Sequence, residues 1–225
     1  MDLKTQKWDQ SYLKKENFIF FPKESVVKFL SRYVRRFVEP NEIKDIARLP
    51  SAPRALDLGC GIGRQTLLLD EFGFEAYGAD ISENAIAEAK KLFHSRGQPE
   101  LCSRLTVLTN DQLPYENQFF DVVISDSVLD SMYFEHAKKL VKECARISKQ
   151  FLFVTLIAGP PKEVEVNGDF ESGTIQSYFD ERKISELIAK TGFQISSLEL
   201  VETRDLIKGF KNSRYYVTMI KGSTS

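Results

Sequence analysis

The chain has 225 residues, a length typical of one domain with at most a small appendage. Hydrophobic residues make up 42% and charged residues 28% of it, which excludes extensive disorder and leaves enough apolar material for a packed core. The net charge of −1 excludes a strongly basic nucleic-acid-binding protein, although it leaves room for a local basic patch.

The three cysteines, Cys60, Cys102 and Cys144, are far apart and odd in number, so we expect neither a disulfide scaffold nor a CxxC metal site. The first residues are polar and lack the apolar core of a secretory signal. No stretch approaches the roughly 18 apolar residues of a membrane span. These features predict a cytoplasmic protein with no membrane partner.

Residues 1–50 are predicted to form a helical cap. Apolar residues fall at helical spacing on one face between Val26 and Phe37. Pro22 suits the start of this helix, and Pro40 with Asn41 suits its end. Basic residues lie on the opposite face, which is either a solvated surface or a surface for phosphate or nucleic acid. They are Lys28, Arg32, Arg35 and Arg36.

From residue 54 onward, short apolar runs alternate with helical patterns. We predict strands over residues 54–58, 75–79, 105–108, 120–125 and 151–156. Helices are expected at 64–72, 83–95, 135–148 and 184–190, and two final strands at 194–201 and 214–220. This order predicts an α/β fold with a doubly wound sheet that is mostly parallel and ends in an antiparallel C-terminal edge hairpin.

A glycine-rich loop follows the first of these strands. Gly59, Gly61 and Gly63 let the backbone turn tightly and let a ligand approach where no Cβ stands in the way. A dinucleotide fingerprint would need a third glycine where the chain has Arg64. Asp57 at the strand end would also repel a pyrophosphate, whereas it would attract a ligand that carries an amine.

At these residues the sequence resembles the class I S-adenosylmethionine-dependent methyltransferases, over about residues 54–200. DLGCGIG is followed in the family's order by GADIS, by LPYENQFFDVV and by SDSVLDSM. The resemblance implies a Rossmann-like domain at residues 51–222 that binds S-adenosylmethionine and yields S-adenosylhomocysteine. It is strongest with small members that modify small molecules.

The resemblance also implies roles for individual residues. Asp80 would accept hydrogen bonds from both ribose hydroxyls, Asp57 would face the ammonium of the cofactor, and either Asn110 or Asp111 would accept from the adenine amino group. The full set of residues implied to bind the cofactor is Asp57, Gly59, Gly61, Asp80, Ile81, Asn110, Asp111, Gln112, Leu113, Ser125 and Asp126.

Methyl transfer from a sulfonium mainly requires alignment of donor and acceptor, and it needs a general base only when the acceptor still holds its proton. Asp126 and Asp130 follow the fourth strand and are the candidates for this catalytic role. His136 is interpreted as a surface or capping residue, and His94 as structural. No metal-binding cluster is expected.

Two segments are predicted to cover the substrate. The aromatic N-terminus, with Trp8 and Tyr12, either covers the pocket or packs on the flank of the domain. The long connection at about residues 158–179 is either a substrate lid or a surface hairpin. Within it Glu171, Gln176 and Tyr178 are the candidates to contact a polar substrate.

We therefore expect a methyltransferase that acts on O or N of a small-molecule substrate. The alternatives are a methyltransferase for RNA or protein, which would use the basic N-terminal face, and a catalytically silent subunit that binds S-adenosylmethionine for a partner. A nicotinamide-linked dehydrogenase fits poorly because of Arg64 and Asp57. The C-terminal edge hairpin makes a homodimer possible, and nucleic acid is not expected as a partner.

Overall fold

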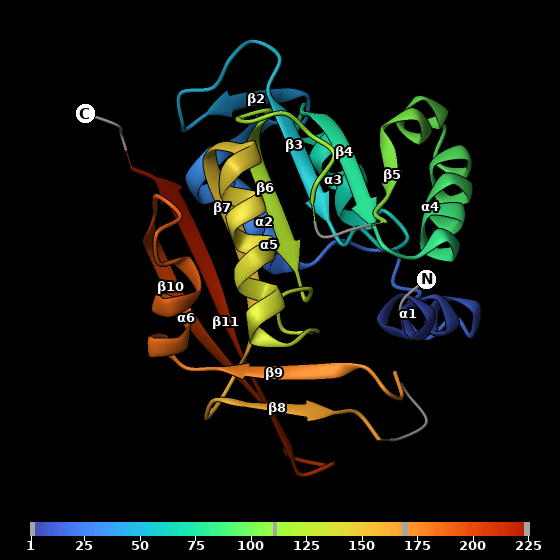
Figure 1. Ribbon diagram of the computed structural model, residues 1–225. Helices are drawn as coiled ribbons and strands as arrows, with labels where there is room; N and C mark the ends of the chain where they lie inside the picture. The colour runs from blue at the N-terminus through green and yellow to red at the C-terminus, as the bar shows by residue number, and fades with distance from the viewer. Residues whose placement is uncertain (1–2, 110–111, 168–170, 223–225) are drawn as a thin grey trace.

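The computed structural model describes residues 3–109, 112–167 and 171–222. Within these residues a nine-stranded sheet forms the centre of the molecule (Figure 1). Its main path runs β10 (Phe193–Asp205), β11 (Phe210–Lys221), β7 (Ser148–Ala158), β6 (Phe120–Asp126), β3 (Arg54–Leu58), β4 (Glu75–Asp80) and β5 (Leu105–Val107).

The five strands from β7 to β5 run parallel, while β11 and β10 are antiparallel to their neighbours. This arrangement confirms the predicted doubly wound sheet with an antiparallel edge hairpin. Strand β6 is buried along nearly its whole length, as its continuous apolar sequence predicts for a strand covered on both faces.

Helices cover both faces of the sheet. Helices α5 (Phe134–Ile147) and α6 (Glu181–Ile188) lie in front of it in Figure 1, and α3 (Arg64–Glu71) and α2 (Glu24–Phe29) lie behind it. Helix α4 (Glu83–Ser95) packs near β4 and β5, and the short 3₁₀ turn η2 (Pro99–Arg104) connects it to β5. The side chain of Ser82 caps α4 by accepting from the backbone N–H of Ala85 at 3.0 Å, as the sequence predicts.

The predicted helix from Pro22 to Pro40 is wrong in its second half. Helix α2 continues as one π-helical turn, η1 (Leu30–Val34), and the chain then forms the hairpin β1 (Arg35–Glu39) and β2 (Glu42–Asp45). Arg35 explains the change, because its buried guanidinium donates to the carbonyl oxygens of Phe72 and Gly73 and also binds Asp45. The backbone at Arg35 is extended, with a φ of −160°, while its side chain reaches these partners.

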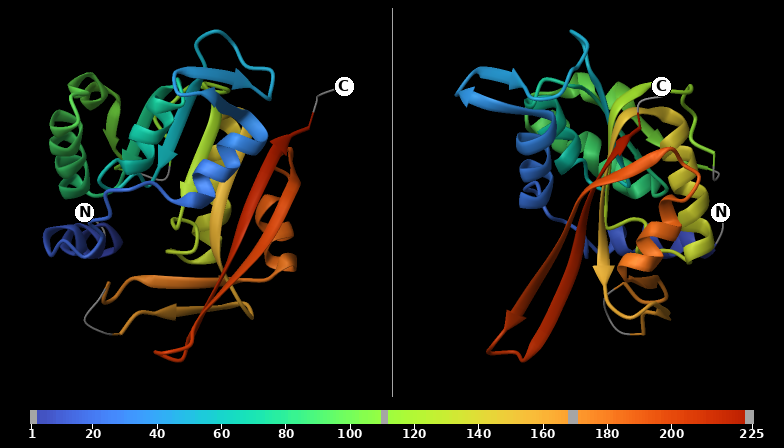
Figure 2. Two further views of the ribbon diagram at one scale, coloured as in Figure 1. Left: turned by 180° about the vertical axis from the view of Figure 1, so that it is seen from behind. Right: turned by 90° about the vertical axis from the view of Figure 1, so that its left-hand side faces the viewer.

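Residues 24–34 belong to the main core behind the sheet. Val26, Leu30 and Val34 are fully buried, and the ring of Phe29 stacks on Phe153 with 4.7 Å between centroids. Helix α1 (Leu3–Leu13) is separate from this core and lies at the end of the sheet to which the carboxyl ends of β3, β4 and β6 point (Figures 1 and 2). The predicted cap at 1–50 thus combines α1, which lies at the end of the sheet, with residues 24–34, which pack behind the sheet.

The connection at residues 158–179 forms a hairpin of β8 (Lys162–Glu165) and β9 (Ile175–Phe179). Strand β9 joins the main sheet by pairing with the end of β7. The ribbon of β10 and β11 extends past the body of the molecule (Figure 2) and exposes Leu206 and Ile207 at its turn. Over the described residues, no helix has the length and apolar character needed to cross a membrane.

Replacing Phe29 by Ala should lower the free energy of unfolding by about 3–5 kcal/mol, because the change leaves a cavity in a packed aromatic cluster. Urea unfolding followed by circular dichroism measures this. The control is Phe21→Ala, whose side chain is 74% exposed and whose loss should change stability by less than about 0.5 kcal/mol. Equal effects of the two changes would contradict the placement of α2 in the core.

Candidate functional site

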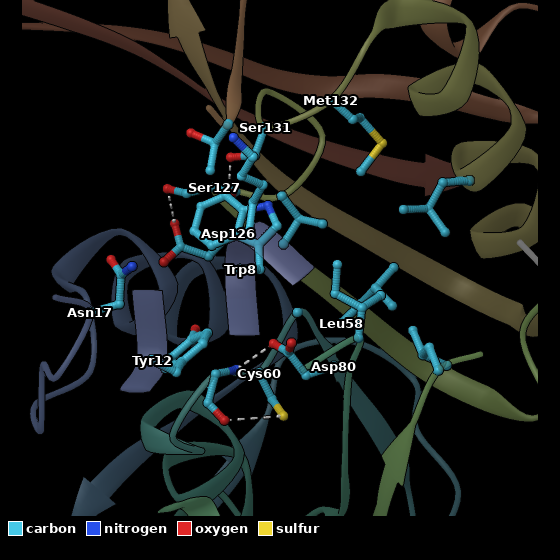
Figure 3. A pocket seen from close by; sticks show the side chains of 18 of the residues that line it. Trp8, Tyr12, Asn17, Leu58, Cys60, Asp80, Asp126, Ser127, Ser131 and Met132 are labelled. Atoms are coloured by element: carbon cyan, nitrogen blue, oxygen red, sulfur yellow. Dashed lines mark hydrogen bonds between the residues drawn. The ribbon is translucent and has the colours of Figure 1, made fainter. Parts of the chain in front are cut away.

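A cavity of about 590 Å³ lies at the carboxyl ends of β3, β4 and β6. Open α/β sheets bind their ligands at this edge. Helix α1 and the segment that follows it contribute one wall, the start of α5 contributes another, and the far end of the β8–β9 hairpin contributes a third. Figure 3 shows side chains from α1, from the ends of β4 and β6 and from the loop after β6 around the same space.

The turn after β3 forms the floor of the cavity. Gly59, Gly61 and Gly63 all have positive φ, at 74°, 54° and 84°, a region that residues with a Cβ rarely adopt. A Cβ on Gly59 would lie 2.2 Å from Val128, and one on Gly61 would lie 2.5 Å from the Tyr12 hydroxyl. Both the backbone conformation and the close packing therefore require glycine here.

Asp80 lies at the end of β4 with its carboxylate held in one orientation. One oxygen accepts from the backbone N–H of Gly61 at 2.8 Å, and the other accepts from the backbone N–H of Ser82 at 2.9 Å. The side chain lines the cavity (Figure 3), although the residue is only 6% exposed. This places a fixed hydrogen-bond acceptor between the glycine turn and the start of α4.

Asp57 is almost fully buried beneath the same turn. Burial raises the pKa of its carboxyl group to about 7, although a hydrogen bond of 2.9 Å from the Thr66 hydroxyl acts in the opposite direction. The charged and neutral forms of Asp57 are therefore both populated near neutral pH. A cationic group placed in the cavity would favour the charged form.

Asp126, at the end of β6, is the centre of a polar network. It pairs with the Lys23 ammonium at 2.9 Å and accepts from the Thr155 hydroxyl at 2.6 Å. Burial acts to raise the pKa of Asp126, but Lys23, Thr155 and Arg64 together outweigh it and hold that pKa below the ordinary value. Asp126 is therefore an ionised anchor and a weak proton acceptor.

Ser127 follows Asp126 with a φ of 60°, an uncommon value for a residue with a side chain. Its backbone N–H donates to Thr155, and its hydroxyl accepts from Lys23 at 2.9 Å and from Arg214 at 3.1 Å. These bonds hold the strained turn in place. The turn directs the following residues along the wall of the cavity (Figure 3).

The N-terminal segment lines the cavity with Trp8, Tyr12, Asn17 and Ile19. The Tyr12 hydroxyl lies directly over Gly61, and burial, with Asp80 close by, raises the pKa of Tyr12 well above its usual range. Tyr12 therefore stays a neutral hydroxyl. These side chains line the cavity, and their role as a cover in binding stays a prediction.

The structure brings most of the predicted cofactor and substrate residues together around this cavity. Those that line it are Trp8, Tyr12, Asp57, Gly59, Gly61, Asp80, Ile81, Leu113, Asp126 and Glu171. Asn110 and Asp111 lie outside the described residues. Among the described residues, Gln112, Ser125, Asp130, Gln176 and Tyr178 do not line the cavity.

Three of these departures have a clear physical reason. Asp130 is 1% exposed and pairs with Arg214 at 3.0 Å, so its carboxylate supports the loop after β6 from outside the cavity. The strand β9 carries Gln176 and Tyr178 away toward its pairing with β8 and β7, and only its first residue, Ile175, reaches the cavity.

Sequence reasoning missed several residues of the site. Lys23 and Arg64 supply the cations that face Asp126, yet neither has a local sequence signal. His136, interpreted from the sequence as a surface or capping residue, lines the cavity from an exposed position near the start of α5. No group of three or more potential metal ligands occurs in the part of the chain that the structure describes.

Comparisons with known proteins find several methyltransferases among the similar proteins. Residues 56–151 match a family described as a methyltransferase domain. A magnesium-protoporphyrin O-methyltransferase from Synechocystis is 27% identical over 159 residues, which are 66% of this chain and 66% of that protein. The sequence matches to four curated relatives span 27% to 66% of the lengths of those relatives.

Solved structures share the fold. Magnesium protoporphyrin IX methyltransferase from Synechocystis, with bound SAM, has a TM-score of 0.60 at 21% identity and covers 99% of this chain and 85% of its own. A 1,6-didemethyltoxoflavin-N1-methyltransferase from Burkholderia thailandensis has a TM-score of 0.69 at 13% identity, with 97% and 87% covered. The [4+2]-cyclase SpnF has a TM-score of 0.64 at 17% identity, with 96% and 94% covered, so the fold alone does not fix the reaction.

The raised pKa of Asp57 predicts a pH dependence of stability. The carboxyl group of the unfolded chain loses its proton near its ordinary pKa of 3.8, whereas that of the folded chain keeps it until about pH 7. Asp57 therefore makes the free energy of unfolding fall as the pH rises through this window. Between pH 5 and 8 this fall in the free energy of unfolding is on the order of 2 kcal/mol, and Asp57→Asn should remove it.

Urea unfolding of the two proteins at both pH values measures this difference. Asp130, whose pKa burial raises to about 6, contributes with the same sign and is present in both proteins, so its share cancels. The exposed Glu71→Gln serves as a control and should leave the wild-type pH dependence unchanged. If Asp57→Asn keeps the full wild-type dependence, Asp57 does not carry the raised pKa.

Proposed function

We propose that this chain, which belongs to the class I S-adenosylmethionine-dependent methyltransferase family, transfers the methyl group of that cofactor to an O or N atom of a small-molecule acceptor. One observation carries the proposal. The Asp80 carboxylate is held by Gly61 at the point where the carboxyl ends of β3 and β4 open into a cavity. A fixed carboxylate beside a turn built of glycines suits a ligand with a sugar diol and an amino-acid part.

The residues around the cavity fit this cofactor. Gly59 and Gly61 line the cavity at positions of the turn that carry no Cβ, and Ile81 and Leu113 add apolar surface on which a flat base can lie. The buried Asp57 lies where a positive ammonium group would stabilise its charged form. A negatively charged pyrophosphate would meet unfavourable charge at the same place.

When bound, S-adenosylmethionine supplies an activated methyl group on a positively charged sulfur. The chain itself contributes orientation and exclusion of water. Asp80 would hold the ribose, while Trp8 and Tyr12 would cover the cavity and keep solvent away from the reacting atoms. The ionised Asp126, fixed by Lys23 and Thr155, contributes a constant negative charge near the end of β6.

The part of the cavity formed by the loop after β6, the start of α5 and the β8–β9 hairpin is where the acceptor would bind. It is lined by apolar Met132, Leu140 and Ile175 together with the polar side chains of Ser131 and His136. Such a mixture suits a small molecule with an apolar body and a few polar groups. The names of two similar proteins include an O-methyltransferase and an N1-methyltransferase, which supports oxygen and nitrogen as the atoms to test.

The two alternatives make different demands on the site. A polymer acceptor needs an open groove, whereas here α1 and the β8–β9 hairpin both contribute walls to the cavity, which favours a small acceptor. A silent binding subunit would keep the cofactor-binding residues and lack methyl transfer.

Incubation with methyl-labelled S-adenosylmethionine and separate pools of small molecules, RNA and protein distinguishes these three functions. Label in the small-molecule pool supports the proposal, and label confined to RNA or protein contradicts it.

Replacing Asp80 by Ala should weaken the binding of S-adenosylmethionine and S-adenosylhomocysteine by about 1.5–3 kcal/mol, because charge-assisted hydrogen bonds to the ribose are lost. Isothermal titration calorimetry measures both affinities. The surface change Glu71→Ala controls for loss of an acidic residue and should leave them unchanged. An unchanged affinity in Asp80→Ala would remove this residue from the ribose site.

Deletion of residues 1–22 should abolish turnover and leave the domain folded. The deleted segment provides Trp8, Tyr12 and Asn17 to the cavity, but its described part contributes no buried residue to the core behind the sheet. Circular dichroism confirms that the truncated chain is folded before methyl transfer is assayed. A fully active truncation would reduce the N-terminal segment to a packing role.

A further inference from the structure

One contact between α1 and α4 has no part in the function proposed so far. Asp9 lies on α1 between Trp8 and Tyr12, which line the cavity. Its carboxylate accepts hydrogen bonds from residues at the start of α4. We propose that Asp9 is a positioning residue that latches α1 over the cofactor and sets the rate at which the demethylated cofactor leaves. This inference rests on the proposed function, because it assigns the regulation of release to the same cavity.

Asp9 makes three hydrogen bonds across the interface. One carboxylate oxygen accepts from the Ser82 hydroxyl at 2.7 Å and from the backbone N–H of Asn84 at 3.1 Å. The other accepts from the side-chain amide of Asn84 at 2.6 Å. A single side chain of α1 thus binds two polar residues at the start of α4.

The start of a helix is well suited to this contact. The first backbone N–H groups of a helix have no partner within it, and its dipole favours a negative charge there. The Ser82 hydroxyl accepts a hydrogen bond from the backbone N–H of Ala85, and Asp9 accepts one from the backbone N–H of Asn84. Asp9 therefore completes the cap of α4 from another helix, so undocking α1 would return both the carboxylate and this N–H to water.

The latch is connected to the cofactor site through Ser82. The Ser82 hydroxyl donates to Asp9, while the Ser82 backbone N–H donates to the carboxylate of Asp80. One residue thus separates the latch from the carboxylate proposed to hold the ribose. On the other side of the latch, the Tyr12 hydroxyl lies over Gly61, which donates to the same carboxylate.

Ser82 thus contacts both α1, through Asp9, and the carboxylate of Asp80 that is proposed to bind the ribose. Release of α1 would withdraw Trp8 and Tyr12 from the cavity wall and would remove a partner of Ser82. A ligand held between Asp80 and α1 would then leave faster. Lys7 also lies against Gly173, and the backbone N–H of Glu171 donates to Glu16 at 3.2 Å, so α1 and the loop after it contact the connection between β8 and β9 as well.

The chain's one tryptophan makes the latch directly measurable. Because Trp8 is next to Asp9, its fluorescence reports the docking of α1 without interference from other tryptophans. The experiment compares the wild type with Asp9→Ala, Asp9→Asn and the matched control Gln10→Ala, an exposed neighbour on the same helix. Acrylamide quenching of Trp8 is measured first without ligand, and circular dichroism confirms that all four proteins are folded.

Asp9→Ala should raise the quenching of Trp8, because α1 spends more time undocked, while Gln10→Ala should match the wild type. Asp9→Asn should give an intermediate value, because the amide oxygen still accepts from Ser82 and Asn84 but carries no charge. In stopped-flow displacement, the dissociation rate of S-adenosylhomocysteine should rise about tenfold in Asp9→Ala, as expected for the loss of one or two net hydrogen bonds.

Wild-type quenching in Asp9→Ala would overturn the latch. Increased quenching with an unchanged dissociation rate would overturn the coupling between the latch and ligand release. Failure of the wild type itself to bind S-adenosylhomocysteine would overturn the proposed function, and with it the release step. The ligand-free quenching then still decides whether Asp9 docks α1, so the two failures are distinguishable.

Discussion

The hydrogen bond from the Gly61 backbone to the Asp80 carboxylate is the constraint on which the rest of the site depends. It joins the turn after β3 to the end of β4 and fixes the floor of the cavity. The turn is possible only because glycines take positive φ values there. The Tyr12 hydroxyl occupies the space that a Cβ on Gly61 would need, so the same residue also sets how closely α1 approaches.

The charges around the floor are arranged for a ligand that carries positive charge. Asp57, Asp80 and Asp126 come from the ends of three neighbouring strands, while Lys23 and Arg64 both face Asp126. The carboxylate of Asp57 accepts from the neutral Thr66 hydroxyl, and burial raises its pKa. A cationic cofactor would supply the positive charge that stabilises the ionised form of Asp57, which connects the electrostatics of the site to the proposed methyl donor.

Much of this arrangement was predictable because the signals are local. The strands, the glycine turn and the Ser82 cap follow from apolar runs, glycine spacing and helix-capping chemistry within a few residues. The hairpin at Arg35 and the latch at Asp9 were not predictable, because their partners lie far along the chain. Glu171 and Tyr178 looked equivalent in sequence, but Glu171 precedes β9 and lines the cavity, whereas the pairing of β9 with β7 and β8 holds Tyr178 away from it.

Titration calorimetry of the purified chain with S-adenosylmethionine, S-adenosylhomocysteine and NAD, in parallel, tests which cofactor this cavity binds. We expect binding of the first two ligands and none of NAD, because the carboxylates at the floor of the cavity disfavour a pyrophosphate. Binding of NAD alone, or of none of the three, would contradict the assignment of this cavity to S-adenosylmethionine.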